Sequence, residues 1–138
     1  MAMLEVNGLQ VYYGVIQALK DISFEVNQGE VIALIGANGA GKSTLMRTMA
    51  AFQSPLRGGV CVDGQFVSSY TPRELSERIG VVLTERDLPA DLAIDEVVGL
   101  GRAPYTNFWG TLTVDDRKVI DEAMSLVGLD DLRHRKIH

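Results

Sequence analysis

The chain has 138 residues, 46% of them hydrophobic, and a formal net charge of −5. This length suits one domain with its own hydrophobic core, and the acidic balance argues against nucleic acid as a partner. No apolar run reaches the roughly 18 residues of a membrane-spanning helix. A single cysteine, Cys61, rules out an internal disulfide framework, and we expect it to be a small buried residue in a strand.

The hydrophobic pattern of residues 4–35 predicts three strands. Residues 4–13 alternate loosely and end at Gly14, and residues 18–26 alternate apolar and polar side chains well. A turn at 27–30 separates them from residues 31–35, Val-Ile-Ala-Leu-Ile. A continuous apolar run of this length is typical of a strand covered on both faces. We therefore predict a buried strand at 31–35.

A glycine-rich loop follows, and residues 44–50 after it predict a helix. The loop fits the phosphate-binding pattern G-x-x-x-x-G-K-[ST], and strand, loop and helix form the context that this motif needs. Glycines let the backbone wrap closely around a phosphate. The loop N–H groups form an anion-binding nest, and the helix N-terminus adds positive dipole. The predicted phosphate site consists of Gly36, Ala37, Asn38, Gly39, Ala40, Gly41, Lys42, Ser43 and Thr44.

Individual side chains of this loop have distinct expected roles. Lys42 places an ammonium on the β- and γ-phosphates, and the Ser43 hydroxyl ligates Mg²⁺. Thr44 adds a further phosphate contact. The alternative is a chance match in an ordinary glycine-rich turn, which the flanking strand and helix disfavour.

Residues 54–83 predict short elements divided by turns. A strand is expected at 60–62, a hairpin turn at 63–64 and a second buried strand at 79–83. Between them, residues 71–74 (Thr-Pro-Arg-Glu) carry the signature of a capping box. We therefore predict a helix that begins after Thr71 and runs to about residue 78.

After Thr84 the pattern becomes helical. Residues 87–93 predict an irregular connector, and residues 94–102 and 113–127 predict helices. The second helix keeps its apolar residues near one face, and Gly128 marks its end. The last residues, 133–138, form a basic run that we expect to be solvated surface.

The combination resembles the nucleotide-binding subunit of an ATP-binding cassette (ABC) transporter, over the whole chain. Many small GTPases and nucleoside kinases open with the phosphate loop, whereas 35 residues precede it here, and no Asn-Lys-x-Asp motif for guanine is present. The resemblance is carried by Tyr13-Gly14, by residues 18–24, by Gly29-Glu30, by the form G-x-N-G-A-G-K-S-T at 36–44, and by residues 58–64.

The resemblance implies an α/β fold: a P-loop NTPase core with an N-terminal antiparallel β subdomain at 1–86, and the start of a helical subdomain at 87–138. It also implies ATP and Mg²⁺ as cofactors. Tyr13 lies where the family keeps an aromatic residue that stacks on adenine. Tyr12 points to the other face of the strand, so Tyr13 is preferred; a half-buried strand aromatic is the alternative.

A second family position departs from the pattern. The family's Q-loop glutamine touches Mg²⁺ and couples to the membrane partner, but an ungapped alignment places Thr84, followed by Glu85, at that position. The shorter Thr84 hydroxyl could reach the metal only through water. The location of the loop carries over, and a direct metal role for Thr84 stays open.

Residues 100–110, Leu-Gly-Arg-Ala-Pro-Tyr-Thr-Asn-Phe-Trp-Gly, resemble a segment of ABC ATPases that import iron–siderophore, haem or cobalamin. The resemblance implies a peripheral subunit on the cytoplasmic face of the inner or plasma membrane. Its implied partners are integral membrane permease subunits, a second ATPase copy and, indirectly, a periplasmic or surface substrate-binding protein. Tyr105, Phe108 and Trp109 either pack the helical subdomain or meet the permease, and both can hold.

Other motifs of the family are not found in these residues: the signature Leu-Ser-Gly-Gly, the Walker B Asp–Glu, the D-loop and the switch histidine. Residues 92–96 superficially resemble Walker B, but a helical pattern follows, so Asp95 and Glu96 are expected as first-turn acids. We expect an N-terminal half of a longer subunit, inactive as an ATPase by itself. The alternatives are a soluble ABC protein of translation or repair, or another P-loop phosphotransferase.

Overall fold

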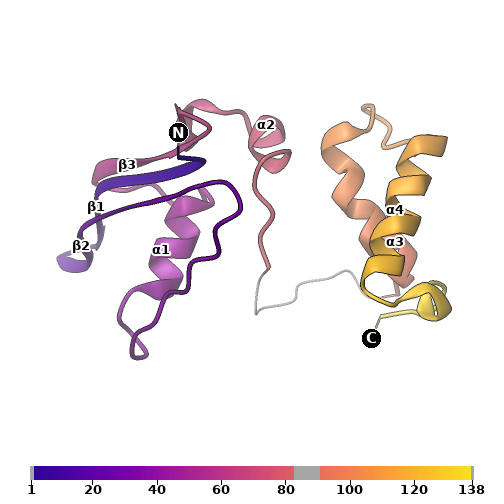
Figure 1. Cartoon of the computed structure of the whole chain (residues 1–138), viewed down its shortest axis with the longest axis horizontal. Coiled ribbons are helices and arrows are strands. Elements are labelled where there is room, and N and C mark those ends of the chain that lie inside the picture. Colours follow the sequence, from indigo (N-terminus) through magenta and orange to yellow (C-terminus); the bar gives the residue numbers. More distant parts are fainter. Residues whose placement is uncertain (1, 83–90, 138) are drawn as a thin grey trace. The chain divides into compact units, whose positions relative to one another are not determined.

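The computed structural model describes residues 2–82 and 91–137. The chain divides into two compact units, residues 1–81 and 82–138, which are drawn in Figure 1 and described here one at a time. The predicted boundary between residues 86 and 87 falls among residues that are not described, so it stays a prediction. Thr84 and Glu85 also lie outside the described residues.

A four-stranded antiparallel sheet organises the first unit, in the order β2-β1-β3-β4. Strand β1 (Leu4–Tyr13) pairs with β2 (Ile16–Val26) on one side and with β3 (Arg57–Val62) on the other. Strand β4 (Gln65–Phe66) pairs with β3 at the edge. The three strands predicted at 4–13, 18–26 and 60–62 are confirmed, although β2 and β3 begin earlier than expected.

The hairpin between β3 and β4 is also confirmed. Asp63 and Gly64 both have positive φ, 50° and 77°, as the favoured two-residue turn of a twisted hairpin requires. Cys61 lies in β3 as expected, but it is only partly buried. That burial raises the pKa of its thiol.

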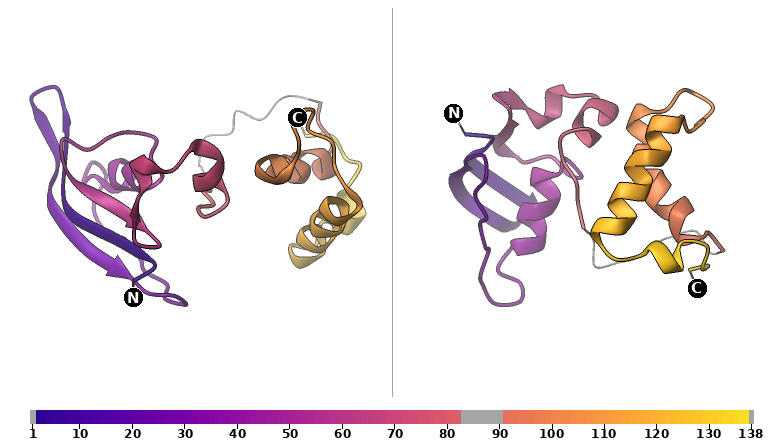
Figure 2. Two further views of the ribbon diagram at one scale, coloured as in Figure 1. Left: turned by 90° about the horizontal axis from the view of Figure 1, so that it is seen from above. Right: turned by 45° about the vertical axis from the view of Figure 1, so that its right-hand side comes forward.

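The core of the first unit explains why the alternation in β1 is loose. Val6, Leu9 and Val11 are buried, and the register between β1 and β2 shifts between these positions. A bulge inserts an extra residue and moves the inward face along the strand. Helix α1 (Lys42–Met49) lies against the sheet (Figure 2), and its Leu45 joins these strand residues in the core.

The two predicted buried strands at 31–35 and 79–83 are wrong for this structure. Residues 31–35 and 79–82 belong to no strand, and Val31, Ile35 and Val82 are 98%, 95% and 99% exposed. A strand exists only when a neighbour accepts and donates its ladder hydrogen bonds, and no strand within 2–82 or 91–137 lies beside either segment. Ile32 and Leu34 are partly covered where they line a hollow beside α1. In the other segment, Ile79 packs against the core and Val81 is 38% exposed.

Helix α2 (Pro72–Ser76) confirms the capping box. The Thr71 hydroxyl accepts from the Glu74 N–H at 3.3 Å, and the Thr71 N–H donates to the Glu74 carboxylate at 2.8 Å. That backbone N–H lowers the pKa of Glu74. The helix ends at Ser76, slightly before the expected residue 78.

The second unit is helical. Helices α3 (Ile94–Gly99) and α4 (Val114–Leu126) pack side by side, as Figures 1 and 2 show. The predicted helix at 94–102 is α-helical only to Gly99 and continues as the 3₁₀ helix η2 (Leu100–Tyr105). Pro104 lies inside η2; proline removes a backbone donor and clashes with the preceding turn of an α-helix, which favours the tighter form here.

The predicted first-turn acids of α3, the apolar face of α4 and the glycine that ends α4 are found in this unit. Asp95 and Glu96 lie in the first turn of α3, and Glu96 accepts from the Ala93 N–H at 2.7 Å. Ile120 and Met124 are the buried apolar residues of α4. Gly128 follows α4 with φ of 71°. A short 3₁₀ helix, η3 (Asp130–Leu132), comes next.

The basic run is more than solvated surface. Arg133 forms an ion pair with Asp121, which raises the pKa of its guanidinium, and His134 Nδ1 lies 3.4 Å from the Asp95 carboxylate. The Ile137 N–H donates to the Leu92 carbonyl at 2.9 Å. The run is therefore held against α3 and α4 by charge and backbone bonds.

Within residues 2–82 and 91–137, no helix is both long enough and apolar enough to cross a membrane.

Candidate functional site

The phosphate-type loop enters α1 through glycines that no other residue could replace without strain. Gly39 and Gly41 have φ of 81° and 99°, in the left-handed region. A Cβ added to Gly41 would lie 2.9 Å from the Leu19 side chain and 3.0 Å from the Ala18 carbonyl oxygen. The loop therefore passes directly against β2, and both the backbone conformation and the space demand glycine there.

Lys42 folds back into this loop. Its Nζ donates to the carbonyl oxygens of Gly36 and Ala37, the second at 3.0 Å. A Cβ on Gly36 would come within 3.1 Å of the Ala40 Cβ, so glycine at 36 lets the two sides of the loop approach each other. An ammonium has three donors, and two are used by the loop itself. The loop thus encloses a cation that keeps a donor for an anion.

The first turn of α1 adds to this positive potential. Its leading N–H groups have no partner within the helix, and the helix dipole is positive at this end. The first turn contains no acidic side chain that would neutralise it. Ser43 lies in that turn and is exposed. Ammonium, unpaired N–H groups and an exposed hydroxyl together suit a phosphate group, and a hydroxyl oxygen suits the hard cation Mg²⁺ that accompanies nucleotides.

Tyr13, at the end of β1, lies beside the same helix. Its hydroxyl donates to Gln53 Oε1 at 2.9 Å and lies 3.3 Å from Thr44 Oγ1. The side chain is 50% exposed. The hydrogen bond to Thr44 lowers the pKa of Tyr13. The structure therefore brings the proposed base-stacking residue to the last residue of the loop.

Gln53 is a residue that the sequence reasoning missed. It follows α1 and bonds both Tyr13 and the helix. Glutamine after a helix carries no motif, and 40 positions separate it from Tyr13. Only the fold brings the two together.

The aromatic segment of the second unit is largely exposed. Phe108 and Trp109 are 94% and 84% exposed and pack edge to face, with ring centres 5.4 Å apart. Asn107 Oδ1 accepts from the N–H groups of Trp109 and Thr111, both at 3.1 Å, and so fixes the turn. Phe108 and Trp109 therefore do not pack a core within the described residues.

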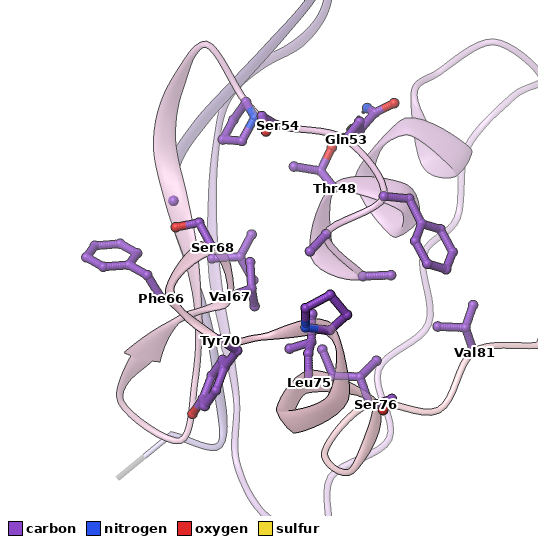
Figure 3. Close-up of a pocket in the computed structure, with 18 of the residues that line it drawn as sticks. Thr48, Gln53, Ser54, Phe66, Val67, Ser68, Tyr70, Leu75, Ser76 and Val81 are labelled. Atoms are coloured by element: carbon purple, nitrogen blue, oxygen red, sulfur yellow. Dashed lines mark hydrogen bonds between the residues drawn. The ribbon is translucent and has the colours of Figure 1, made fainter. Parts of the chain in front are cut away.

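A separate hollow of the first unit lies away from the loop 36–44 (Figure 3). Its volume is about 660 Å³, and it lies between the end of α1, β3 and α2. Its lining among the described residues is mostly apolar, with uncharged polar groups such as Tyr70 and Ser76, and includes no residue of the loop 36–44. It therefore lacks the charge that phosphate chemistry requires.

Comparison with known proteins points in one direction. A family model described as ABC transporter matches residues 19–138. An uncharacterised ABC transporter ATP-binding protein of Methanocaldococcus jannaschii is 40% identical over 130 residues, which are 94% of this chain and 45% of that protein. The ferric enterobactin transport ATP-binding protein of Escherichia coli is 30% identical over 137 residues, covering 99% and 51%. The chain spans about half the length of these relatives.

Two further matches agree. The cobalamin import ATP-binding protein of Halobacterium salinarum is 34% identical over 134 residues, covering 97% of this chain and 33% of that protein. The structure of cbiO1 from Clostridium perfringens, described as part of the ABC transporter complex cbiONQ, has a TM-score of 0.78 at 28% identity, covering 98% of this chain and 54% of that one. These similarities confirm the predicted α/β fold class.

Proposed function

This chain belongs to the ABC transporter family, and on that premise we propose that it supplies the ATP-binding face of an ABC importer's ATPase subunit. The observation that carries the proposal is the enclosure of the Lys42 ammonium by the loop carbonyls at the positive end of α1. A preformed cationic nest at a helix N-terminus is the arrangement that binds nucleotide phosphates.

Each residue of this face has a proposed task. Lys42 exchanges loop carbonyls for oxygens of the β- and γ-phosphates, and the N–H groups around Gly39–Gly41 bind the phosphate chain. Ser43 would hold Mg²⁺, which supplies neutralising charge when bound. The half-exposed ring of Tyr13 receives the base.

We further propose the setting implied by the family. The subunit lies on the cytoplasmic face of the inner or plasma membrane, docked on permease subunits and paired with a second ATPase copy, with a substrate-binding protein as an indirect partner. An iron chelate, haem or cobalamin-type substrate is supported by the names of two relatives, which concern ferric enterobactin and cobalamin. Residues 100–110, quoted above for the same resemblance, add support.

Phe108 and Trp109 are the proposed permease contacts of this chain. Large aromatic residues dominate the binding energy of protein interfaces, and these two are exposed on a turn that hydrogen bonds hold in place. An exposed aromatic pair is costly to leave in water, which favours a partner surface.

Hydrolysis needs more than this face. Phosphoryl transfer requires positive groups placed against the γ-phosphate, a metal ion held from more than one side and an oriented water. The 138 residues contain the P-loop's contribution but neither the Walker B carboxylates nor the signature motif. We propose that ATP hydrolysis by the full-length subunit depends on those motifs, and that residues 1–138 by themselves do not hydrolyse ATP.

The alternatives are a soluble ABC protein and another P-loop phosphotransferase. The test is purification of the full-length protein from membranes in mild detergent, together with substrate uptake by cells that carry wild-type or Lys42→Ala protein. An importer subunit co-purifies with an integral membrane permease, and Lys42→Ala abolishes uptake. Recovery only from the soluble fraction, with uptake unaffected, would instead favour a soluble ABC protein.

A further inference from the structure

The side chain of Gln53 connects Tyr13 to helix α1. Its Oε1 accepts from the Tyr13 hydroxyl at 2.9 Å, and its Nε2 donates to Thr48 Oγ1 at 3.0 Å and to the Thr44 carbonyl at 3.3 Å. Figure 3 shows Gln53 next to Thr48 at the edge of the large hollow. Thr48 is 1% exposed and donates to the Thr44 carbonyl at 2.7 Å. One amide therefore joins the end of β1 to the interior of the helix that follows the loop.

The chemistry of these groups fixes the direction of every bond. A carbonyl oxygen can only accept, so the amide nitrogen of Gln53 must face the Thr44 carbonyl and its oxygen must face Tyr13. The Tyr13 hydroxyl then donates its only proton to the Gln53 oxygen. The 3.3 Å contact between Tyr13 and Thr44 is consequently a bond that Thr44 donates and Tyr13 accepts.

Because Tyr13 accepts from Thr44 and donates to Gln53, a bound phosphate affects these two hydrogen bonds differently. Thr44 belongs to the proposed phosphate site, and a hydroxyl that contacts a phosphate oxygen must donate its proton to it. Phosphate therefore competes with Tyr13 for the Thr44 proton. Gln53 lies outside the loop 36–44, so its shorter bond to Tyr13 is not contested by the phosphate. When a nucleotide is bound, Gln53 is the anchor that remains.

We propose that Gln53 is a positioning residue that holds the Tyr13 ring against α1 and so fixes where the nucleotide base stacks. The inference rests on the proposed function, because it gives Gln53 a task only if Tyr13 receives the base. Stacking tolerates any base but depends on where the ring plane lies. A tethered ring is also ordered in advance, which lowers the entropic cost of binding.

The test compares ATP with tripolyphosphate, each with Mg²⁺, by calorimetry on the full-length protein. Tripolyphosphate reaches the loop but has no base. Gln53→Leu should weaken ATP binding by about two- to ten-fold, the worth of one hydrogen bond, and leave tripolyphosphate binding unchanged. Tyr13→Phe removes the same bond from the other side, together with the Thr44 contact for which phosphate competes. It keeps all bonds between Gln53 and α1, so it should reproduce the effect. Gln28→Leu, in an exposed turn, is the matched control.

The double variant Tyr13→Phe, Gln53→Leu should bind ATP about as tightly as the weaker single variant, because each change already removes the bond between Tyr13 and Gln53. If Gln53→Leu destabilises the protein, the ATP affinity of Tyr13→Phe still tests the inference. Unchanged ATP affinity in Tyr13→Phe, or equal losses for ATP and tripolyphosphate in Gln53→Leu, would overturn the inference. Failure of the proposed base contact is separate: it would show as unchanged ATP affinity in Tyr13→Ala, and this inference would fall with it.

Discussion

Arg102 donates through its Nε to the Asp116 carboxylate at 2.8 Å, with the two side chains 21% and 5% exposed. The same carboxylate accepts from the backbone N–H and the hydroxyl of Thr113, both at 2.9 Å. The Arg102 guanidinium also lies 4.1 Å from the centre of the Tyr105 ring. One buried carboxylate thus caps α4 and anchors η2, the element that leads to the aromatic turn.

We expect the helical unit to lose stability in acid through Asp116. The Thr113 backbone N–H, and then Arg102, hold the pKa of Asp116 below its usual value. A depressed pKa contributes stability that is complete above the ordinary carboxyl range and is lost as pH falls through the lowered pKa. Asp116→Asn should therefore lower the melting temperature at neutral pH and flatten its decline as the pH falls through and below the ordinary carboxyl range.

The comparison for this prediction is Asp115→Asn, an exposed acid in the first turn of the same helix. Amide exchange of α4, followed across the same pH range, reports the local unit. If Asp116→Asn and wild type decline in parallel with acid, the buried carboxylate does not control the stability of this unit.

Lys42→Ala should weaken ATP binding by about 30- to 100-fold, because it removes the charge-assisted bonds of the loop's only cation. Calorimetry on the full-length protein measures the dissociation constant. Lys20→Ala, an exposed lysine on β2, should bind like wild type. An unaltered dissociation constant in Lys42→Ala would refute the assignment of the loop.

Tyr13→Ala should weaken ATP and GTP alike, by about five- to 150-fold, because stacking does not depend on base identity. Phe or Trp at position 13 should recover the stacking part of that loss and keep only the smaller deficit that follows from losing the bond to Gln53. Tyr12→Ala is the neighbouring control on the same strand. If Tyr12→Ala weakens both nucleotides and Tyr13→Ala does not, the wrong tyrosine has been assigned.

The double change Phe108→Ala, Trp109→Ala should uncouple transport while leaving ATP affinity intact. Both rings are exposed, so their removal spares the core and acts only at a partner surface. Uptake and permease co-purification are the readouts. Leu126→Ala, Val127→Ala, at the exposed end of α4, controls for the loss of surface apolar area. Wild-type transport in the aromatic double variant would contradict the docking role.

A polypeptide of residues 1–138 should release no phosphate from ATP in steady state and should self-associate. The bare side chains of Val31, Ile35 and Val82 lie on segments whose backbone has no strand partner in the described parts of the chain, and open edges recruit other copies. The double change Val31→Lys, Ile35→Lys should reduce the associated fraction that sedimentation measures.

For hydrolysis, the measurement is steady-state phosphate release. A rate of about 0.1 per second that Lys42→Ala abolishes would show a complete site within these residues.

The sequence by itself determined what depends on local chemistry. Gly39 and Gly41 adopt the positive φ that the loop motif requires, Asp63 and Gly64 form the expected hairpin turn, and Thr71 and Glu74 form the expected capping box. Each of these outcomes depends on residues within a few positions, so pattern and structure agree.

The tertiary structure decided what depends on distant partners. Residues 31–35 are apolar enough for a buried strand, yet a strand also needs a neighbouring ladder, which lies outside its own sequence. Gln53 reaches Tyr13 only in the folded chain, where residues of β1 and Leu45 of α1 share one hydrophobic core. The buried carboxylate of Asp116 finds its cationic partner, Arg102, 14 positions away in the chain. Composition and periodicity record which side chains need cover or a partner, and only the folded chain determines which group provides it.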